Sequence, residues 1–245
     1  MKSLSLVFFM LVSLKLLAGP KKEYTHNDTT LKKLGKYTLS TPEGSARPAR
    51  PGLMIYFHGS GSTQTYAAGF DGLDQVAQKL GLLAMAIQAP NGHDTWANHA
   101  TGPSNQHDQY VKNLLDKVFP SIPGLDKNKI LFVGMSAGST FLSGDFLPRF
   151  ITRYKGGAVL LCGGGGPISL DNELFTPVSK SEAKGFPIAV FIQQADFLYR
   201  QTLQGVTYWK SRKAEVSFEN PAGGAHCGFD GNKEMERLGR RVLGL

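Results

Sequence analysis

The sequence contains little cysteine, few acidic residues for its number of basic ones, and no long uninterrupted apolar run. Two cysteines in 245 residues exclude a disulfide framework and a four-thiolate zinc site, so the fold must be stabilised by packing. The apolar run at residues 4–14 ends before Lys15, short of the roughly 20 residues that a transmembrane helix needs. A hydrophobic share of 41% excludes disordered, collagen-like and multi-pass membrane chains, and it is enough to form a sizeable core.

The deficit of acidic residues gives a net charge of +8, from 27 basic and 19 acidic side chains. Residues 1–19 contribute +2, residues 20–51 contribute +4, and residues 52–245 contribute only +2. A basic chain can bind nucleic acid or an acidic surface. Because most of the excess precedes residue 52, the charge relates to export or surface attachment, and we expect no nucleic-acid partner.

Residues 1–19 have the pattern of a secretory signal peptide. A lysine at position 2 precedes the apolar run, and the small residues Ala18 and Gly19 follow it. We therefore expect export to the periplasm or the extracellular space, with no stable membrane span; an uncleaved anchor and a buried helix are the alternatives. An oxidising compartment would allow Cys162 and Cys227 to pair, and two buried free thiols remain the other possibility.

The rest of the chain predicts an α/β fold with a mainly parallel central sheet flanked by helices. Residues 20–51 form a polar, basic lead-in with a short strand at 36–40, and residues 52–245, which no linker divides, form one domain. The expected strands are 53–57, 82–87, 129–133, 158–161, 188–192 and 215–218, and the expected helices are 71–80, 110–119 and 233–245. The stretch 163–187 is too short for a large lid domain, which favours an open site for bulky or polymeric ligands.

The sharpest motif is Gly134-Met135-Ser136-Ala137-Gly138, which matches G-x-S-x-G. The pattern alone is weak, and an ordinary glycine turn is the alternative. Here, however, it directly follows a predicted strand, where a sharp turn into a helix would raise the Ser136 hydroxyl above the carboxyl edge of the sheet.

A serine nucleophile needs a general base and an acid that orients the base. His226 is the only histidine after Ser136, and it lies in a glycine-rich loop beyond the last strand. Asp196 follows the strand at 188–192, so the order is serine, acid, histidine. The competing acids are Asp171, Glu173 and Asp230.

The same chemistry requires backbone donors for the developing oxyanion. Ala137, directly after the serine, is one candidate, and Ser60 or Gly61, in the loop after the first central strand, is the other. A glycine-rich loop can also hold phosphate, but the chain has neither G-x-x-x-x-G-K-[ST] nor G-x-G-x-x-G.

These residues together resemble the α/β-hydrolases, and among them the exported polyhydroxybutyrate depolymerases and feruloyl or acetylxylan esterases. The resemblance covers residues 53–245 and implies no cofactor. It places Trp96 beside the site, either stacked on an acyl group or packed under its loop, and His58 as a substrate contact or a structural residue of the oxyanion loop. Cysteines brace the catalytic loops in some members of the resembled group, and the positions of Cys162 and Cys227 would allow such a brace here, with the pairing left open.

No metal is expected, because the spacings of His58, His93, His99 and His107 match no usual zinc pattern.

Members of the resembled group often carry Trp-Pro after the histidine, whereas Cys227-Gly228-Phe229 follows here.

The leading interpretation is an exported serine esterase acting on an ester substrate, including polymeric ones. A serine peptidase or amidase of the same fold, and a non-catalytic carbohydrate- or surface-binding protein, are the alternatives. The sequence predicts neither the acyl and alcohol specificity nor the oligomeric state.

Overall fold

The fold is built on one eight-stranded sheet. The structure, a computed structural model, describes residues 20–41, 48–92, 95–96, 106–166 and 178–245. The strands are β1 (Lys21–Asp28), β2 (Lys33–Ser40), β3 (Gly52–Phe57), β4 (Leu82–Ile87), β5 (Ile130–Met135), β6 (Gly156–Leu161), β7 (Pro187–Phe191) and β8 (Glu215–Glu219). Their order is β1-β2-β4-β3-β5-β6-β7-β8. β2 is antiparallel to both of its neighbours, β1 and β4, and every other neighbouring pair is parallel.

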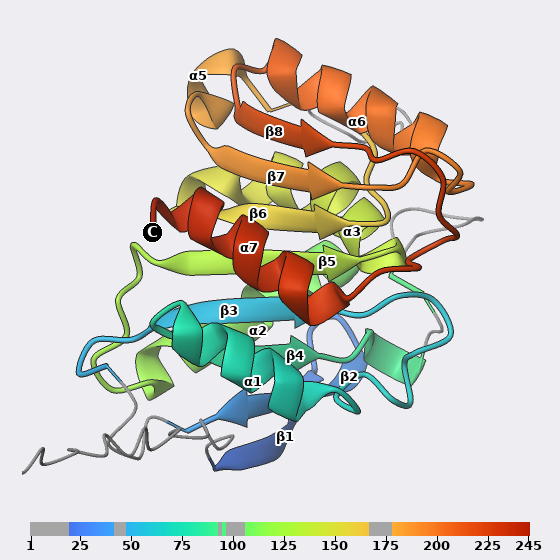
Figure 1. The fold of residues 1–245 in the computed structure, drawn as a ribbon. Coiled ribbons are helices and arrows are strands. Elements are labelled where there is room, and N and C mark those ends of the chain that lie inside the picture. The colour runs from blue at the N-terminus through green and yellow to red at the C-terminus, as the bar shows by residue number, and fades with distance from the viewer. Residues whose placement is uncertain (1–19, 42–47, 93–94, 97–105, 167–177) are drawn as a thin grey trace, which may run out of the picture.

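Helices cover both faces of the sheet. They are α1 (Phe70–Lys79), α2 (His107–Ser121), α3 (Ala137–Phe141), α4 (Leu147–Phe150), α5 (Lys180–Ala183), α6 (Tyr199–Ser211) and α7 (Gly231–Leu243), with a π-helical segment at Leu142–Phe146 and short 3-10 turns at Pro90–Gly92 and Ile151–Arg153. Figure 1 shows α1 and α7 crossing in front of the sheet, with α2 and α3 behind it. In the described part of the chain, every helix is too short or too polar to cross a bilayer.

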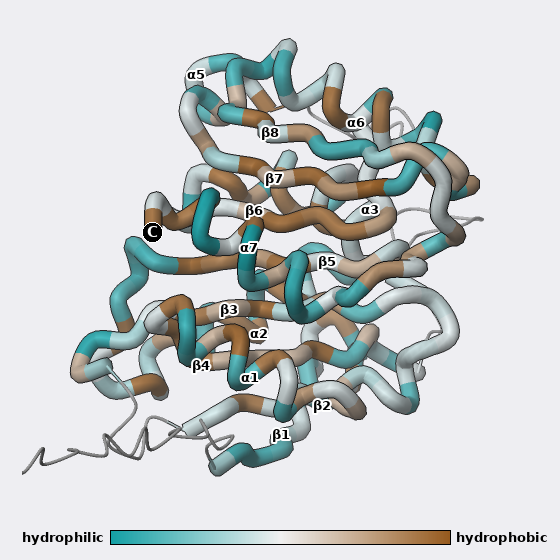
Figure 2. The backbone as a smooth tube through the Cα atoms, in the orientation of Figure 1, coloured by the Kyte–Doolittle hydropathy of each residue, from teal (hydrophilic) through white to brown (hydrophobic). Residues whose placement is uncertain are grey.

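The central strands are apolar because both of their faces are buried, as expected for a parallel sheet. Every residue of β4 is buried, and the hydrophobic colouring in Figure 2 concentrates on the central strands. One apolar layer lies under α1 and α7 and includes Leu73, Val76 and Leu238. The other lies under α2, α3 and α6 and includes Leu114, Phe141 and Trp209.

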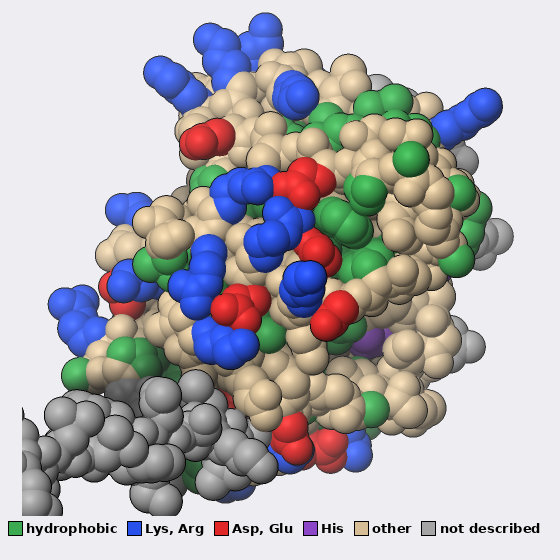
Figure 3. Space-filling model, in the orientation of Figure 1, with side chains coloured by type: hydrophobic (Ala, Val, Ile, Leu, Met, Phe, Trp, Pro, Cys, Tyr) green, Lys and Arg blue, Asp and Glu red, His purple; other side chains and the backbone are tan. Residues whose placement is uncertain are grey.

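Charged side chains of both signs alternate over the face that α7 covers (Figure 3). Glu219 pairs with Arg237 and Arg241, and Glu236 pairs with Lys79. This mixture accords with the nearly neutral charge of residues 52–245.

The structure confirms the predicted strands and the predicted helices to within a few residues, and it changes the interpretation of the lead-in. The stretch expected to carry one strand contains two, and the hairpin β1–β2 continues the sheet beyond β4 with Lys21 opposite Ser40 and Asp28 opposite Lys33. The sequence did not predict β1. Most of its residues are exposed at the edge of the sheet, so the strand shows no clear alternation of apolar and polar residues. Residues 1–19, the predicted signal peptide, lie outside the described residues.

The parallel arrangement brings the ends of β3, β5, β6, β7 and β8 to one edge of the sheet. Their arrowheads point the same way in Figure 1. The loops after these strands therefore meet there, which is where ligands bind in open parallel sheets.

Candidate active site

Ser136 occupies a strained turn between β5 and α3. Its backbone angles are φ 51° and ψ −115°, a region that a residue with a side chain adopts only under constraint. The flanking glycines make the turn possible, since a Cβ at Gly134 would lie 2.5 Å from the Ser139 nitrogen and one at Gly138 would lie 2.2 Å from the Phe57 oxygen. The Ser136 N–H donates to the Leu161 carbonyl at 2.9 Å, which fixes the turn against β6.

Ser136, His226 and Asp196 form one hydrogen-bonded chain. Ser136 Oγ lies 2.9 Å from His226 Nε2, and His226 Nδ1 lies 2.9 and 2.8 Å from the two carboxylate oxygens of Asp196. An ionised carboxylate only accepts, so Nδ1 carries the proton that it donates to Asp196. Nε2 then has a free lone pair facing the serine hydroxyl, which is the arrangement a general base requires.

Asp196 is held in place by its own turn and by the histidine loop. Its side chain is buried, and one carboxylate oxygen accepts from the Leu198 N–H at 2.9 Å. The N–H of Ala195 donates to the Gly223 carbonyl, which connects the turn after β7 to the loop that carries His226. Of the competing acids, Asp230 instead caps α7 by accepting from the Lys233 N–H, and Asp171 and Glu173 lie outside the described residues.

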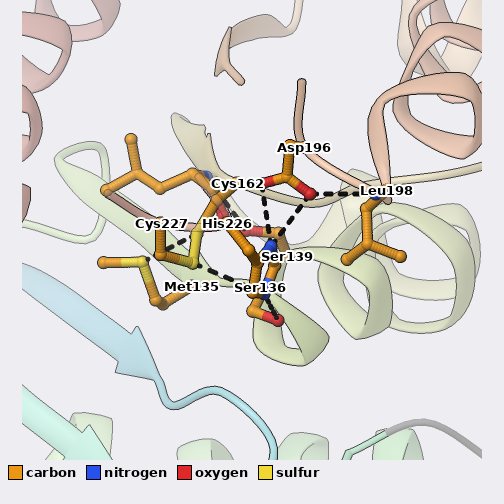
Figure 4. Close-up of a disulfide and its surroundings, with 9 residues drawn as sticks. Met135, Ser136, Ser139, Cys162, Asp196, Leu198, His226 and Cys227 are labelled. Carbon is orange, nitrogen blue, oxygen red and sulfur yellow. Dashed lines mark hydrogen bonds and ion pairs between the residues drawn. A yellow bond between two sulfur atoms is a disulfide. The ribbon is translucent and has the colours of Figure 1, made fainter. Parts of the chain in front are cut away.

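A disulfide joins Cys162, directly after β6, to Cys227, directly after His226. Figure 4 shows this bond beside Met135 and His226. The Cα atoms are 5.2 Å apart, and the bond connects positions 65 residues apart in the sequence. The pairing left open by the sequence is thus present in the structure, and it ties the histidine loop to the strand next to the serine turn.

Not all of the residues expected to supply oxyanion donors line the cavity that contains Ser136. Ala137 begins α3, where its N–H has no intrahelical acceptor. Ala137 and Ser60 line the same cavity as Ser136 and His226, whereas Gly61 is not among its lining residues. Gly59, in the same loop, lies close to the serine, since a Cβ there would be 3.4 Å from the Ser136 Cβ.

The cavity has a volume of about 310 Å³ and contains residues that the sequence analysis did not select. Its remaining walls come from Thr140, Phe197, Leu198 and Gln201. Phe197 and Leu198 follow Asp196 directly, which was the available signal for them. No signal in the sequence indicated Gln201, because it reaches the cavity only through the packing of α6.

For Trp96 and His58, the structure supports the packing and structural roles and not the substrate contacts that were their alternatives. Trp96 is 0% exposed, and its ring packs on Phe141 and Phe57 with centroids 4.9 and 5.2 Å away. It therefore contributes to the core, since a fully buried ring cannot stack on a substrate. The neighbouring residues 93–94 and 97–105, including His93 and His99, lie outside the described residues.

His58 is 1% exposed and acts as a structural residue of its loop. Its Nδ1 lies 2.7 Å from the Gly59 carbonyl oxygen, to which it donates, and its Nε2 accepts from the Ala89 N–H at 3.1 Å. Burial lowers the pKa of His58, which favours the neutral ring that this pair of bonds needs.

Within the described ranges, one group of side chains has the spacing of metal ligands: Cys162, His226 and Cys227. Both cysteines belong to the disulfide, so neither offers a thiolate. The disulfide and the hydrogen bonds of His226 to Ser136 and Asp196 account for this group of side chains.

No family model matches the chain, and no curated protein matches it in sequence. Solved structures do match in fold. A thermostable esterase superposes with a TM-score of 0.69 at 18% identity over 89% of this chain, and this chain spans 62% of that protein's length. The fluorophosphonate-binding serine hydrolase F of Staphylococcus aureus gives 0.66 at 17% identity, covering 92% of this chain and 98% of its own.

An S-formylglutathione hydrolase of Staphylococcus aureus also superposes, with a TM-score of 0.65 at 18% identity, covering 91% of this chain and 98% of its own. These three neighbours are an esterase and two hydrolases, and at such low identity the likeness establishes architecture alone. The eight-stranded sheet, its flanking helices and these superpositions together show that the chain has the α/β-hydrolase fold, with no large additional domain in its described residues.

Proposed function

We propose that this protein is a serine esterase that hydrolyses carboxylic esters through an acyl-enzyme on Ser136. The observation that carries the proposal is the hydrogen-bonded chain from Ser136 through His226 to Asp196, at the wall of a cavity large enough for a substrate. The esterase and serine hydrolase neighbours support it at the level of fold.

In the acylation step, Ser136 Oγ attacks the ester carbonyl carbon while His226 Nε2 takes the hydroxyl proton. Asp196 accepts from Nδ1 throughout and stabilises the imidazolium. The Ala137 N–H and an N–H of the loop Gly59–Gly61 stabilise the oxyanion. The tetrahedral intermediate then collapses, the C–O bond to the alcohol breaks, and His226 returns the proton to the departing alkoxide.

Deacylation repeats these steps with water as the nucleophile. His226 takes a proton from the water as it attacks the acyl carbon, and it returns the proton to Ser136 Oγ when the acid leaves. His226 can serve both steps because its side chain is 29% exposed, so an alcohol or a water molecule can approach Nε2 from solvent.

The finer features of the proposal rest on the sequence motifs. We place the protein in the periplasm or outside the cell, exported by residues 1–19, and the Cys162–Cys227 disulfide supports this because disulfides persist in oxidising compartments. Polymeric, feruloyl, acetyl and alkyl esters are the candidate substrates, by resemblance to exported polyhydroxybutyrate depolymerases and feruloyl or acetylxylan esterases.

The decisive experiment is labelling with a fluorophosphonate probe. The wild-type protein should be labelled, and Ser136→Ala should lose both the label and, by at least about 10⁴-fold, its kcat for nitrophenyl esters, because the nucleophile is gone. Ser211→Ala, which changes an exposed serine at the end of α6, is the matched control and should keep both.

The alternatives give different results in the same assay. A folded wild-type protein without label and without ester hydrolysis would favour a non-catalytic binding protein. Faster turnover of nitroanilides than of matched nitrophenyl esters would favour a peptidase or amidase.

A further inference from the structure

Phe197 is unusually placed for a large apolar residue. It directly follows Asp196, and 75% of its surface is exposed, the largest exposed fraction among the described large hydrophobic residues. A single exposed apolar side chain is common on protein surfaces and needs no function by itself. Its neighbours are what distinguish it.

The Phe197 ring contacts the imidazole of His226 in a tilted arrangement. The ring centroids are 4.4 Å apart and the planes are inclined by 45°. The same side chain lines the cavity that contains Ser136, next to Leu198. An apolar surface is therefore presented to solvent at the mouth of the cavity, within one side chain of the general base.

The other walls of the cavity limit what that surface can bind. Among the described residues that line it, none is Asp, Glu, Lys or Arg, so it offers no ionic partner for a charged substrate. Its volume of about 310 Å³ corresponds to about ten water molecules, more than an acetyl group requires. An apolar group that covers Phe197 would remove exposed hydrocarbon from water, which favours binding.

We propose that Phe197 is a specificity-determining residue, the apolar wall that selects esters with an uncharged, apolar acyl group longer than acetyl. This inference rests on the proposed esterase function. The acyl group is the part of the substrate concerned because it becomes bonded to Ser136 Oγ in the first step and leaves only at the end of the second. The alcohol takes a proton from His226 Nε2 as its bond to the acyl carbon breaks, and it leaves at the end of the first step.

The test compares wild-type protein with Phe197→Ala on nitrophenyl acetate, butanoate and hexanoate. The ratio of kcat/KM for hexanoate to that for acetate should fall about tenfold in Phe197→Ala, since hydrophobic contacts of a few methylene groups discriminate by about this factor or more. Phe197→Leu keeps an apolar side chain and should lose less. Leu203→Ala, which removes an exposed apolar side chain on α6 that does not line this cavity, should leave the ratio unchanged.

Two further measurements separate this role from a purely structural one. A series of ethyl, butyl and hexyl acetates varies the alcohol alone, and the selectivity of Phe197→Ala along it should equal that of wild type. The pH profile of kcat/KM should also be unchanged, because the proposed role does not act through His226.

A uniform loss of activity over all acyl lengths, a shifted pH profile, or a loss that follows the alcohol would overturn the inference while leaving the esterase proposal intact. A wild-type protein that neither takes the fluorophosphonate label nor hydrolyses any of these esters would refute both.

Discussion

At the scale of single residues, the site depends on backbone geometry as much as on side-chain chemistry. Ser136 holds a positive φ because β5 and α3 meet in a turn that Gly134 and Gly138 make sterically possible. Replacing either glycine with alanine would force its Cβ into backbone atoms. The serine turn was predictable because its strand, the serine and the two glycines are consecutive in the sequence, although the Phe57 carbonyl that excludes a Cβ at Gly138 belongs to the distant strand β3.

His58 illustrates a residue whose role concerns stability. Its folded-state pKa lies below the ordinary value of about 6.5, because burial disfavours the charged ring, so the unfolded chain takes up a proton first as the pH falls. The contribution of neutral His58 is therefore complete above about pH 6.5 and is lost as the pH falls below it.

We expect the free energy of unfolding, measured by urea denaturation, to decrease from pH 7.5 to pH 5 in the wild-type protein. His58→Gln should be less stable at pH 7.5 by about 1–2 kcal/mol, through its altered buried hydrogen bonds, and should show a shallower decrease. Some decrease should remain, because burial also lowers the pKa of His26. Equal slopes for the two proteins would show that His58 is not responsible.

At the scale of elements, the histidine loop is positioned by contacts with strands distant in sequence. Backbone hydrogen bonds connect it to the turn after β7, and the Cys162–Cys227 disulfide connects it to the end of β6. His226 is thus attached on both sides to the elements that carry its partners. This attachment should favour the 2.9 Å contact with Ser136 in the absence of substrate.

Removing the disulfide should therefore affect both stability and catalysis. We expect Cys162→Ala combined with Cys227→Ala to lower the free energy of unfolding by about 3–4 kcal/mol, because the bond closes a loop of 65 residues in the unfolded chain. The kcat should fall as well, because the disulfide no longer holds the loop that carries His226 against the end of β6. Urea denaturation and nitrophenyl ester kinetics measure the two effects.

A thiol assay on the exported protein checks the premise of that experiment. Denatured without reductant, the wild-type chain should show no titratable thiol, because the sequence has only these two cysteines. Two thiols per chain would contradict the pairing.

At the scale of the whole molecule, the hairpin β1–β2 completes the sheet on the side of β4. It also packs against neighbouring elements, where Asp28 accepts from the Asn113 side chain on α2 and Glu23 accepts from the Tyr66 hydroxyl. Without the hairpin, β4 would become an exposed, apolar edge strand of the kind that promotes aggregation.

Truncation tests this dependence. A chain of residues 20–245 should fold and melt cooperatively by circular dichroism, whereas residues 42–245 should aggregate or melt at a much lower temperature. A soluble 42–245 chain with the melting temperature of the longer one would show that the hairpin is dispensable.

The sequence predicted elements whose signal is local. The apolar runs of the central strands stand out because both faces are buried, and α7 is readable because its buried residues recur at helical spacing. β1 and α6 were not predicted. β1 is largely exposed, and the sequence of α6 has little that separates it from a polar surface segment.

By itself, the sequence determined the α/β architecture and the chain order of Ser136, Asp196 and His226, because strand periodicity, glycine spacing and parallel connections are encoded in neighbouring residues. Tertiary structure decided that Cys162 pairs with Cys227, that Trp96 and His58 are buried, and that Phe197 packs on His226. These outcomes depend on how loops from distant strands pack at one edge of the sheet. The spacing of residues along the chain does not predict that packing.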